Sequence, residues 1–312
     1  MKSDVKQEKK PFFSICIEVV NREETITRVL RCINSQICRD FELIVVDNGS
    51  IDNSATIIDE ELEKMQDVRV RFVREERKSN PIAGWNRPLS FAQGIFIAIC
   101  EGDDYYEPDH LFQAKKILEQ LPIAGLYVSD LKLNENEPRV IVSGPQKKLS
   151  ELKIFGWCPP PSCVIFRRTS LDGIPFNFDE TFVWAGEYSL YYKILTKGFI
   201  VIENKEKKNV TRGIRFYNKD SFHLKDMLKM REGGYFIYSE DEAAKADSKI
   251  FEIASQYFAF NLGLGKLDFK LLKVLLKYGK IDKVIRTSIS RRFVKFIWQG
   301  VKRRIRNATG IK

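Results

Sequence analysis

Short apolar runs and helix-like stretches alternate along the first two hundred residues of this 312-residue chain. The apolar runs are rich in β-branched residues, and each has the length of a single buried strand. They lie at 12–20, 41–46, 68–73, 95–99 and 125–133. Between them, apolar residues return at the spacing of one helix face. This alternation predicts an α/β fold with a Rossmann-like, mostly parallel sheet, right-handed crossovers and flanking helices.

The same pattern locates the helices and one late strand. Helices are expected at 26–37, 53–65, 80–94, 108–121 and from Gly186 to Gly198, and the late strand at 163–168, after three consecutive prolines. Two segments interrupt the rhythm. Residues 134–149 are polar and contain two prolines, and residues 203–218 are basic, so both are predicted to be loops.

From Phe222 onward the pattern is mostly helical, and the charge changes with it. The net charge of the chain is +10, but residues 266–312 carry 15 lysines and arginines against two aspartates, so the rest is slightly acidic. Between Phe269 and Ile305, apolar residues recur at helical spacing and basic residues gather on another face. We expect this basic, amphipathic helical appendage to lie on an anionic membrane surface. The alternative is that its apolar stripe packs on the body of the protein.

Cysteine usage and the N-terminus indicate a compartment. The six cysteines form no CxxC motif and most lie in apolar surroundings, as expected of reduced core residues. The charged N-terminus is not followed by the apolar region of a signal peptide, and no run approaches the roughly 18 apolar residues of a membrane span. The expected location is cytoplasmic, peripheral on the inner face of the cell membrane.

Polar side chains follow three of the predicted strands at the points where the strands end. They are Glu18 and Asn21, Asp47 and Asn48, and Glu101, Asp103 and Asp104. In open α/β sheets, ligands bind outside the carboxyl ends of the strands. Clustered carboxylates there suit a hard divalent cation that carries a diphosphate. Taken alone, the last cluster also fits a solvated acidic turn.

Five ordered motifs between Phe12 and Gly198 resemble glycosyltransferase family 2, the inverting enzymes with the A-type nucleotide-sugar fold. They are the strand that leads to Asn21, SQICRDFELIVVDNGSIDNS, NPIAGWNRPLSFAQGIFIA, EGDDYYEPDHL, and PPPSCVIFRR with the later Glu187. One such piece would be weak, and the resemblance comes from five pieces in family-like order and spacing.

The resemblance implies roles for the matching positions. Expected to bind the nucleotide sugar are Glu18, Asn21, Asp47, Asn48, Trp85, Asn86, Asp103, Arg212 and Arg215. Within this set Asp47 and Asn48 would read base and ribose. The two arginines would contact a diphosphate, and a structural salt bridge is an equal alternative. The metal ligands would be Asp103 with Glu101 or Asp104.

Glu187 stands where the family keeps the carboxylate proposed as catalytic base. A glutamate that only complements a helix dipole is the alternative. The chain departs from the family pattern at several positions. Glu18, Val19 and Val20 precede Asn21 in place of a proline or threonine and an aromatic residue; Asn48 and Glu101 each replace an aspartate; and Gly186 precedes Glu187 in place of a Glu-Asp pair. These changes concern the identity of the donor sugar and of the nucleotide base.

The chemistry explains why carboxylates are needed. Transfer from a nucleoside-diphosphate sugar leaves negative charge on the diphosphate, which Mg²⁺ or Mn²⁺ held by oxygen ligands would neutralise. Inversion needs a base to take the proton of the attacking hydroxyl, and such a base contributes about 10²–10⁴-fold. With only two histidines in the chain, a histidine-rich metal site is excluded.

The sequence therefore predicts a metal-dependent inverting glycosyltransferase that uses a UDP- or dTDP-sugar. The acceptor would be a glycan or a polyprenyl-diphosphate-linked molecule in cell-envelope polysaccharide or glycolipid synthesis. We expect a disordered N-terminus at 1–10, a glycosyltransferase domain at 11–220 with a nucleotide-binding half at 11–122 and an acceptor half at 123–220, and the helical region at 221–312. The open alternatives are a non-catalytic nucleotide-sugar-binding protein and, for the tail, nucleic acid, which its apolar stripe disfavours. The acidic loop 18–24, which lacks glycine, argues against a sugar nucleotidyltransferase.

Overall fold

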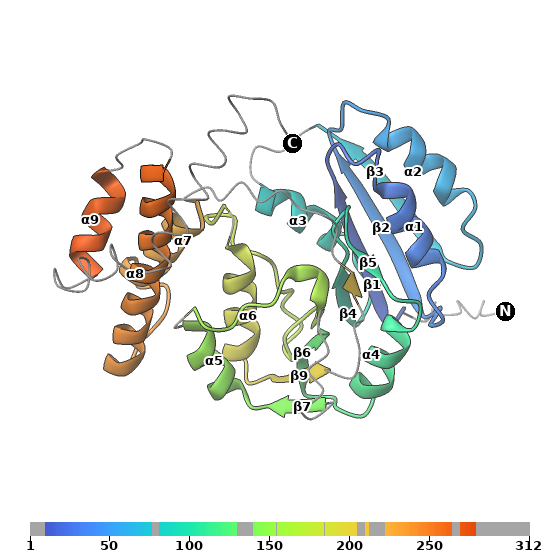
Figure 1. Ribbon diagram of the computed structural model, residues 1–312. Helices are drawn as coiled ribbons and strands as arrows, with labels where there is room; N and C mark the ends of the chain where they lie inside the picture. Colours follow the sequence, from blue (N-terminus) through green and yellow to red (C-terminus); the bar gives the residue numbers. More distant parts are fainter. Residues whose placement is uncertain are drawn as a thin grey trace. The chain divides into compact units, whose positions relative to one another are not determined.

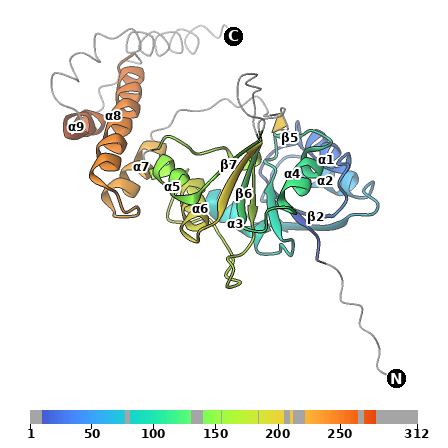
Figure 2. The same ribbon diagram turned by 90° about the horizontal axis from the view of Figure 1, so that it is seen from below.

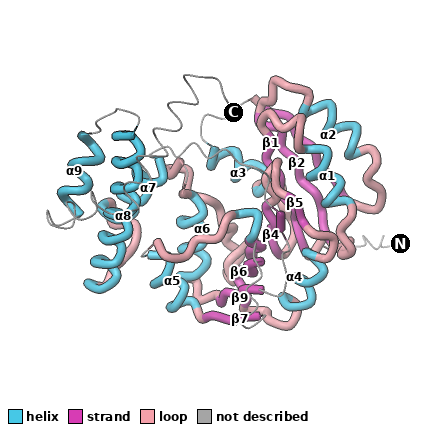
Figure 3. Tube along the Cα trace, viewed as in Figure 1, coloured by secondary structure: helices cyan, strands magenta, loops and turns pink. Residues whose placement is uncertain are grey.

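The computed structural model describes residues 10–76, 81–129, 140–153, 155–183, 185–204, 210–211, 222–263 and 269–278. The chain divides into two compact units, one of residues 1–149 and 158–216 and the other of residues 150–157 and 217–312. The first unit contains the strands, and the described part of the second is helical (Figure 3). The domain boundaries expected from the sequence stay a prediction.

The first unit is built on an eight-stranded sheet with the order β3-β2-β1-β4-β8-β6-β9-β7. Its N-terminal strands pair in parallel. They are β1 (Phe13–Val19), β2 (Phe41–Asn48), β3 (Arg69–Glu75) and β4 (Phe96–Ile99), joined by α1 (Ile26–Asn34), α2 (Ser54–Leu62) and α3 (Pro81–Leu89). The predicted Rossmann-like, mostly parallel sheet with flanking helices is confirmed.

Alternate side chains of the central strands face different helical layers. Ile15 and Ile17 of β1 belong to one buried cluster with Val29 of α1, Ile58 of α2 and Leu111 of α4 (His110–Leu118). Figure 1 shows α1 and α2 on one side of β1 and β2, with α3 and α6 (Gly186–Thr196) on the other. Because full burial of an aliphatic side chain contributes about 1.5–3 kcal/mol, this cluster holds the strand ends firmly in place.

The second half of the sheet mixes directions. It contains β6 (Ala124–Ser129), β7 (Val140–Ser143), β8 (Val164–Arg167) and β9 (Ile200–Asn204). Strand β8 is antiparallel to both β4 and β6, β9 is parallel to β6, and β7 is antiparallel to β9. The three prolines before β8 lead into a 3₁₀ turn at Pro161–Cys163. Figure 2 shows β6 and β7 from below.

The prediction of a surface loop at 134–149 was wrong for its second half. Strand β7 and the start of α5 (Pro145–Lys153) occupy residues 140–149. The β-branched run at 140–142 pairs along β9, and Pro145 takes the first helical position, where its missing N–H costs nothing. Similarly, α4 begins at His110, two residues after the proline expected in its first turn.

A second, two-stranded sheet lies next to the acidic turn. Strand β10 (Val210–Thr211) pairs antiparallel with β5 (Tyr105–Tyr106). The prediction of a basic loop at 203–218 was therefore wrong at two places. Strand β9 extends to Asn204, and Val210–Thr211 form a strand that pairs with the residues that follow Asp104. Two-residue strands carry no periodic signal, so sequence patterning could not detect them.

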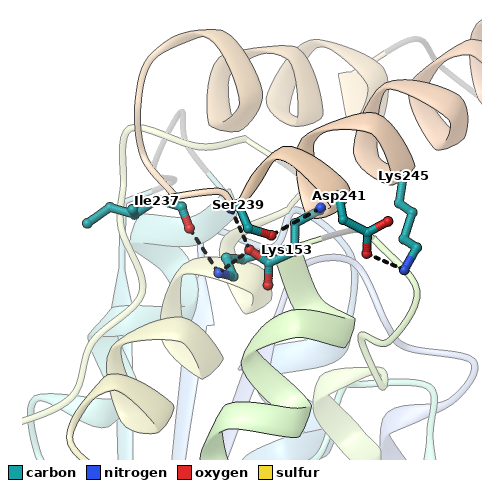
Figure 4. Close-up of polar contacts among 6 residues, drawn as sticks. Lys153, Ile237, Ser239, Asp241 and Lys245 are labelled. Carbon is teal, nitrogen blue, oxygen red and sulfur yellow. Dashed lines mark hydrogen bonds and ion pairs between the residues drawn. The ribbon is translucent and has the colours of Figure 1, made fainter.

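The second unit is held by helix packing and ion pairs. It contains the end of α5, α7 (Phe222–Glu232), α8 (Glu240–Gly263) and α9 (Phe269–Tyr278). Ser239 and Glu242 form a reciprocal capping box at the start of α8. Lys153 Nζ donates to Glu242 Oε2 at 2.6 Å and to the carbonyl of Ile237 at 2.9 Å, as Figure 4 shows for Ile237.

The C-terminal helices agree with the predicted helical appendage as far as α9. Leu275 of α9 is buried, whereas Leu276 is half exposed. The more basic stretch after Tyr278 lies outside the described residues. Within the described part of the chain, no helix combines the length and apolar character needed to cross a membrane.

Candidate functional site

The carboxyl ends of β2, β1 and β4 lie next to one another at one edge of the sheet. Parallel pairing places Val19 opposite Asp47, and Cys16 opposite Ile99. The three polar clusters that follow these strands are therefore neighbours, as parallel topology requires. The structure brings Glu18, Asn21, Asp47, Asn48 and the acidic turn 101–104 to one rim.

Asp47 is completely buried at the end of β2. Its Oδ1 accepts a hydrogen bond from Ser50 N at 2.9 Å, which fixes the turn after the strand. Its Oδ2 lies 3.3 Å from Arg74 Nε, within ion-pair distance, but the geometry is not that of a hydrogen bond. Among the described residues no hydrogen-bond donor contacts this buried oxygen, although Arg74 lies within ion-pair distance.

Two side chains tie the end of β1 to the end of β2. Asn21, with a positive φ of 50°, accepts from Ile51 N through its side chain at 2.9 Å, and its N–H donates to Ser50 Oγ at 3.0 Å. Glu18 accepts from the Asn48 amide at 2.8 Å. Gly84 of α3 packs on this last pair, since a Cβ there would lie 2.8 Å from both side chains. The helix can approach the rim only because residue 84 is glycine.

The carboxylates of the acidic turn differ in burial. Asp104 is completely buried, whereas Asp103 and Glu101 are half-buried. Glu101 is held by Ser162, whose hydroxyl lies 3.2 Å from Glu101 N and 3.3 Å from Glu101 Oε2. Burial therefore distinguishes Asp104, enclosed by the fold, from the two carboxylates that reach the surface of the turn.

Arg22 is a residue that sequence reasoning did not single out. Its stem lies against Gly102, where a Cβ would be 3.0 Å from Arg22 Cγ. Its backbone is fixed, because Arg22 N donates to Ser54 Oγ at 2.7 Å and its carbonyl accepts from Thr25 N and Ile26 N at 2.9 Å. The guanidinium is exposed and, within the described residues, forms no ion pair. The sequence did offer one signal that could have identified Arg22, namely an arginine that lies next to the acidic end of a strand.

The acidic turn is compatible with a metal that arrives with a diphosphate. The described residues contain no group of three or more His, Cys, Asp or Glu side chains placed to hold a metal ion. Mg²⁺ usually keeps several waters and binds one or two carboxylates together with substrate phosphates. Asp103 and Glu101, both partly exposed, supply oxygen ligands of that kind.

Glu187 lies in the first turn of α6, half-buried in a cluster of tyrosines and a thiol. Burial, and then the charge of Glu187, raise the pKa of the Cys158 thiol well above its ordinary value. Burial also raises the pKa of Tyr191, with smaller contributions from the charges of Cys158, Glu187, Cys163 and Glu101. Glu187 and the acidic turn are thus both within electrostatic reach of one tyrosine, whose hydroxyl donates to Pro159 O at 3.0 Å.

Gly186, which replaces an acidic residue of the family pattern, has a packing reason. A Cβ at this position would lie 2.5 Å from Ile82 Cδ1 of α3. This contact brings the start of α3 against the start of α6 and so positions the turn that carries Glu187.

The expected nucleotide contacts Trp85 and Asn86 lie on α3 and face the segment at 178–180. The ring of Trp85 is 5.2 Å from that of Phe178. Asn86 Oδ1 accepts from Phe178 N at 2.9 Å, and its Nδ2 lies 3.0 Å from Phe178 O and 2.9 Å from Glu180 Oε1. Asn86 thus positions this segment, and its part in nucleotide binding stays a prediction. Arg212 and Arg215 lie outside the described residues.

Comparison with known proteins gives relatives for most of this unit. The chain is 26% identical over 199 residues to the amylovoran biosynthesis glycosyltransferase AmsB of Erwinia amylovora. The aligned region covers 60% of this chain and 65% of AmsB. It is 24% identical over 211 residues to the succinoglycan biosynthesis protein ExoO of Rhizobium meliloti, covering 61% and 58%. The chain thus spans less than two thirds of either relative.

Solved structures share the fold. Residues 1–349 of S. aureus TarS, in complex with UDP, superpose with a TM-score of 0.60 and 18% identity, covering 97% of this chain and 92% of that one. The mannosyltransferase PcManGT of Pyrobaculum calidifontis, in complex with GDP-Man and Mn²⁺, gives 0.59 and 15%, covering 98% and 89%. At these identities the likeness concerns the fold alone. The sequence profile described as glycosyl transferase family 2 matches residues 14–174, and the chain therefore belongs to that family.

Proposed function

We propose that the protein is a metal-dependent inverting glycosyltransferase that transfers a sugar from a nucleoside-diphosphate sugar to a glycan or lipid-linked acceptor. The observation that carries this proposal is the presence of Asp47, the acidic turn and Glu187 in one unit, with segment 159–162 in hydrogen-bond contact with both Glu101, through Ser162, and helix α6, through Tyr191. The reaction needs three parts, which are a group that recognises the nucleotide, a site for the diphosphate and a general base that accepts a proton.

The donor binds along the rim in this proposal. Asp47, whose Oδ2 accepts no hydrogen bond among the described residues, accepts one from the base, and Asn48 contributes to base and ribose recognition. UDP- and dTDP-sugars both present a ring N–H to such an acceptor. The fold neighbours bound to UDP and to GDP-Man support a nucleotide-sugar donor without deciding between bases.

The diphosphate lies at the acidic turn, where charge must be neutralised as the sugar leaves. Asp103, assisted by Glu101, would hold Mg²⁺ or Mn²⁺, which supplies Lewis-acid stabilisation of the leaving group. Asp104 is the weaker candidate for assistance because it is completely buried. Arg22 adds a permanent positive charge beside the same turn and a bidentate donor set that suits phosphate oxygens.

Glu187 takes the proton of the acceptor hydroxyl as that hydroxyl attacks the anomeric carbon from the face opposite the diphosphate. Its half-buried position among Cys158 and tyrosines limits water around the carboxylate. The neighbouring Gly186 contact with Ile82 fixes the backbone that carries it, which serves the geometric requirement of proton transfer.

The acceptor and location are proposed from the relatives and the charge of the chain. AmsB and ExoO are named for amylovoran and succinoglycan biosynthesis, so we assign this chain to polysaccharide synthesis. The basic C-terminal residues suit the cytoplasmic face of an anionic membrane, where a polyprenyl-diphosphate acceptor would be found. Deletion of residues 279–312 is expected to abolish binding to anionic vesicles.

The decisive experiment measures nucleoside diphosphate release from a panel of UDP-, dTDP- and GDP-sugars, with Mn²⁺ or with chelator, in the presence of acceptor extracts. One donor is expected to turn over only with metal. Glu187→Gln should lower kcat by about 10²–10⁴-fold with donor affinity unchanged, because the amide cannot take a proton. Glu60→Gln, an exposed helical glutamate, is the matched control.

The outcomes separate the two candidate functions. Donor binding by calorimetry without turnover in any acceptor extract would favour a non-catalytic nucleotide-sugar-binding protein. Binding of no donor at all would eliminate both.

A further inference from the structure

Helix α3 contacts both the rim of the sheet and the helix that carries Glu187. It packs against β1 and β2, and Gly84 approaches the polar side chains at the carboxyl ends of these strands. Ile82 and Asn86 lie four residues apart and so share one face of the helix. Gly84, two residues from each, lies on the opposite side. Because Ile82 packs on Gly186, the face that carries Asn86 is the one turned toward the start of α6.

The side-chain amide of Asn86 binds the backbone of Phe178 on both sides. Phe178 N donates to Asn86 Oδ1 at 2.9 Å, and Asn86 Nδ2 donates to Phe178 O at 3.0 Å and to Glu180 Oε1 at 2.9 Å. Because a backbone N–H can only donate, the first of these bonds fixes the orientation of the amide. Both hydrogens of Nδ2 are then used by the other two bonds. In the part of the chain that the structure describes, Asn86 therefore has no side-chain N–H left for a nucleotide.

The segment that Asn86 holds, residues 178–180, is bonded in turn to α6. These residues belong to no helix or strand, so their backbone polar groups depend on side-chain partners. Asp179 N donates to Ser189 Oγ at 3.0 Å, and the Ser189 hydroxyl donates to Gly186 O at 2.6 Å. Ser189 is completely buried. The segment thus joins α3 to the first turn of α6, the turn that carries the proposed base.

We propose that Asn86 is a positioning residue for Glu187 and not a ligand of the nucleotide. The inference rests on the proposed function, in which Glu187 is the general base. Proton transfer requires the carboxylate to lie within about 2.6–3.2 Å of the acceptor hydroxyl, so a small displacement of the first turn of α6 lowers the rate. Loss of the Asn86 bonds releases the backbone of Phe178 and removes one of the links that hold this turn to α3. The contacts at the rim lie on the opposite side of α3 and stay in place.

The first test separates turnover from donor binding in the full chain. Asn86→Ala should lower kcat by about 10²-fold, the scale of a misplaced reacting group, and leave donor affinity by calorimetry unchanged. Ser189→Ala removes the other end of the link and should act in the same way. Asn177→Ala is the matched control, because this exposed asparagine precedes the same segment and its side chain forms no hydrogen bond among the described residues. Thermal melting verifies folding, and Asn86→Ser replaces Asn86→Ala should the latter unfold.

A double-mutant cycle tests whether Asn86 acts through Glu187. In the Glu187→Gln background the base is already lost, so adding Asn86→Ala should change the residual kcat by less than about threefold. Independent losses that multiply would overturn the proposal. A tenfold weaker donor affinity in Asn86→Ala would also overturn it, because that is the result expected of a nucleotide ligand.

Hydrogen exchange measures the structural part of the proposal without any donor. Peptides that cover residues 178–190 should exchange faster in Asn86→Ala than in the native chain, whereas those of β2 should exchange at the same rate. Equal exchange of 178–190 in the two proteins would contradict the proposal. If the native chain binds no donor, or if Glu187→Gln leaves kcat unchanged, the proposed function fails and Asn86 has no base to position. The exchange measurement then still decides whether Asn86 holds the first turn of α6.

Discussion

The ends of β2 and β4 both present acidic residues after a buried strand, yet they are built in different ways. At β2, Asp47 is completely buried, one of its oxygens is fixed by Ser50, and Asn48 is paired with Glu18. At β4, Asp103 and Glu101 reach the surface of the turn and only Asp104 is enclosed. The β2 end thus offers a fixed acceptor that suits a directional hydrogen bond, and the β4 end offers accessible charge that suits a cation.

The difference teaches that an aspartate after a strand does not by itself identify a metal site. The two strand ends differ in how far solvent and ligands can reach their carboxylates. A carboxylate that must share a cation with a diphosphate needs open coordination positions, whereas one that reads a base gains from being held rigidly. Three substitutions and one pH titration follow, from the largest expected effect to the smallest.

Asp103→Asn should produce the largest loss, because it removes charge from the β4 end while keeping the shape of the side chain. We expect kcat/KM to fall by about 10³-fold, the scale of removing one group that stabilises a developing charge. Steady-state rates with titrated Mn²⁺ measure it. Asp59→Asn on the exposed face of α2 is the control. A loss below tenfold would contradict the assignment of charge to this turn.

Asp47→Asn tests the β2 end and should act on binding. A hydrogen bond to a charged group is worth about 1.5–3 kcal/mol, so donor KM should rise by roughly 10–100-fold with kcat nearly unchanged. Calorimetric donor affinity verifies that the change lies in binding. If kcat fell and affinity did not, the two strand ends would not have the separate roles described above.

Arg22→Ala tests the residue that adjoins both ends. Loss of one charge-assisted contact to the diphosphate should weaken donor affinity by about tenfold, and Arg22→Lys should recover part of it. The effect should increase when metal is limiting, because the two positive charges act on the same group. Equal affinity of the native chain and Arg22→Ala at every metal concentration would remove Arg22 from the site.

A pH titration probes the support under the β4 end. His110 is completely buried with its ring 4.4 Å from that of Tyr106, and in the described part of the chain neither ring nitrogen has a hydrogen-bond partner. Burial lowers its pKa from 6.5 to about 3. Between these values the unfolded chain binds the extra proton and the folded protein does not, so stability is full above pH 6.5 and falls as pH decreases.

The expected loss from His110 is about 1.4 kcal/mol at pH 5.5 relative to pH 8. Urea unfolding at the two pH values measures it, and His110→Phe should remove this part of the pH dependence. An unchanged pH dependence in His110→Phe would show that His110 is not its source.

The sequence by itself determined the layout of the N-terminal half of the sheet. Apolar runs and helical spacing located β1, β2 and β4, and parallel topology alone requires their carboxyl ends to meet. The positions of Asp47 and Asp103 at one rim followed from those two facts, because strand period and crossover rules act locally along the chain.

Tertiary structure decided what local pattern cannot express. Burial distinguished Asp104 from Asp103, although the two are adjacent in sequence. The contacts of Arg22 with Gly102 and of Ile82 with Gly186 join residues that are far apart in the sequence. Strands β7 and β10 likewise form because a partner edge is available to them. Such contacts depend on how elements pack in three dimensions, and the order of hydrophobic and polar residues does not record that packing.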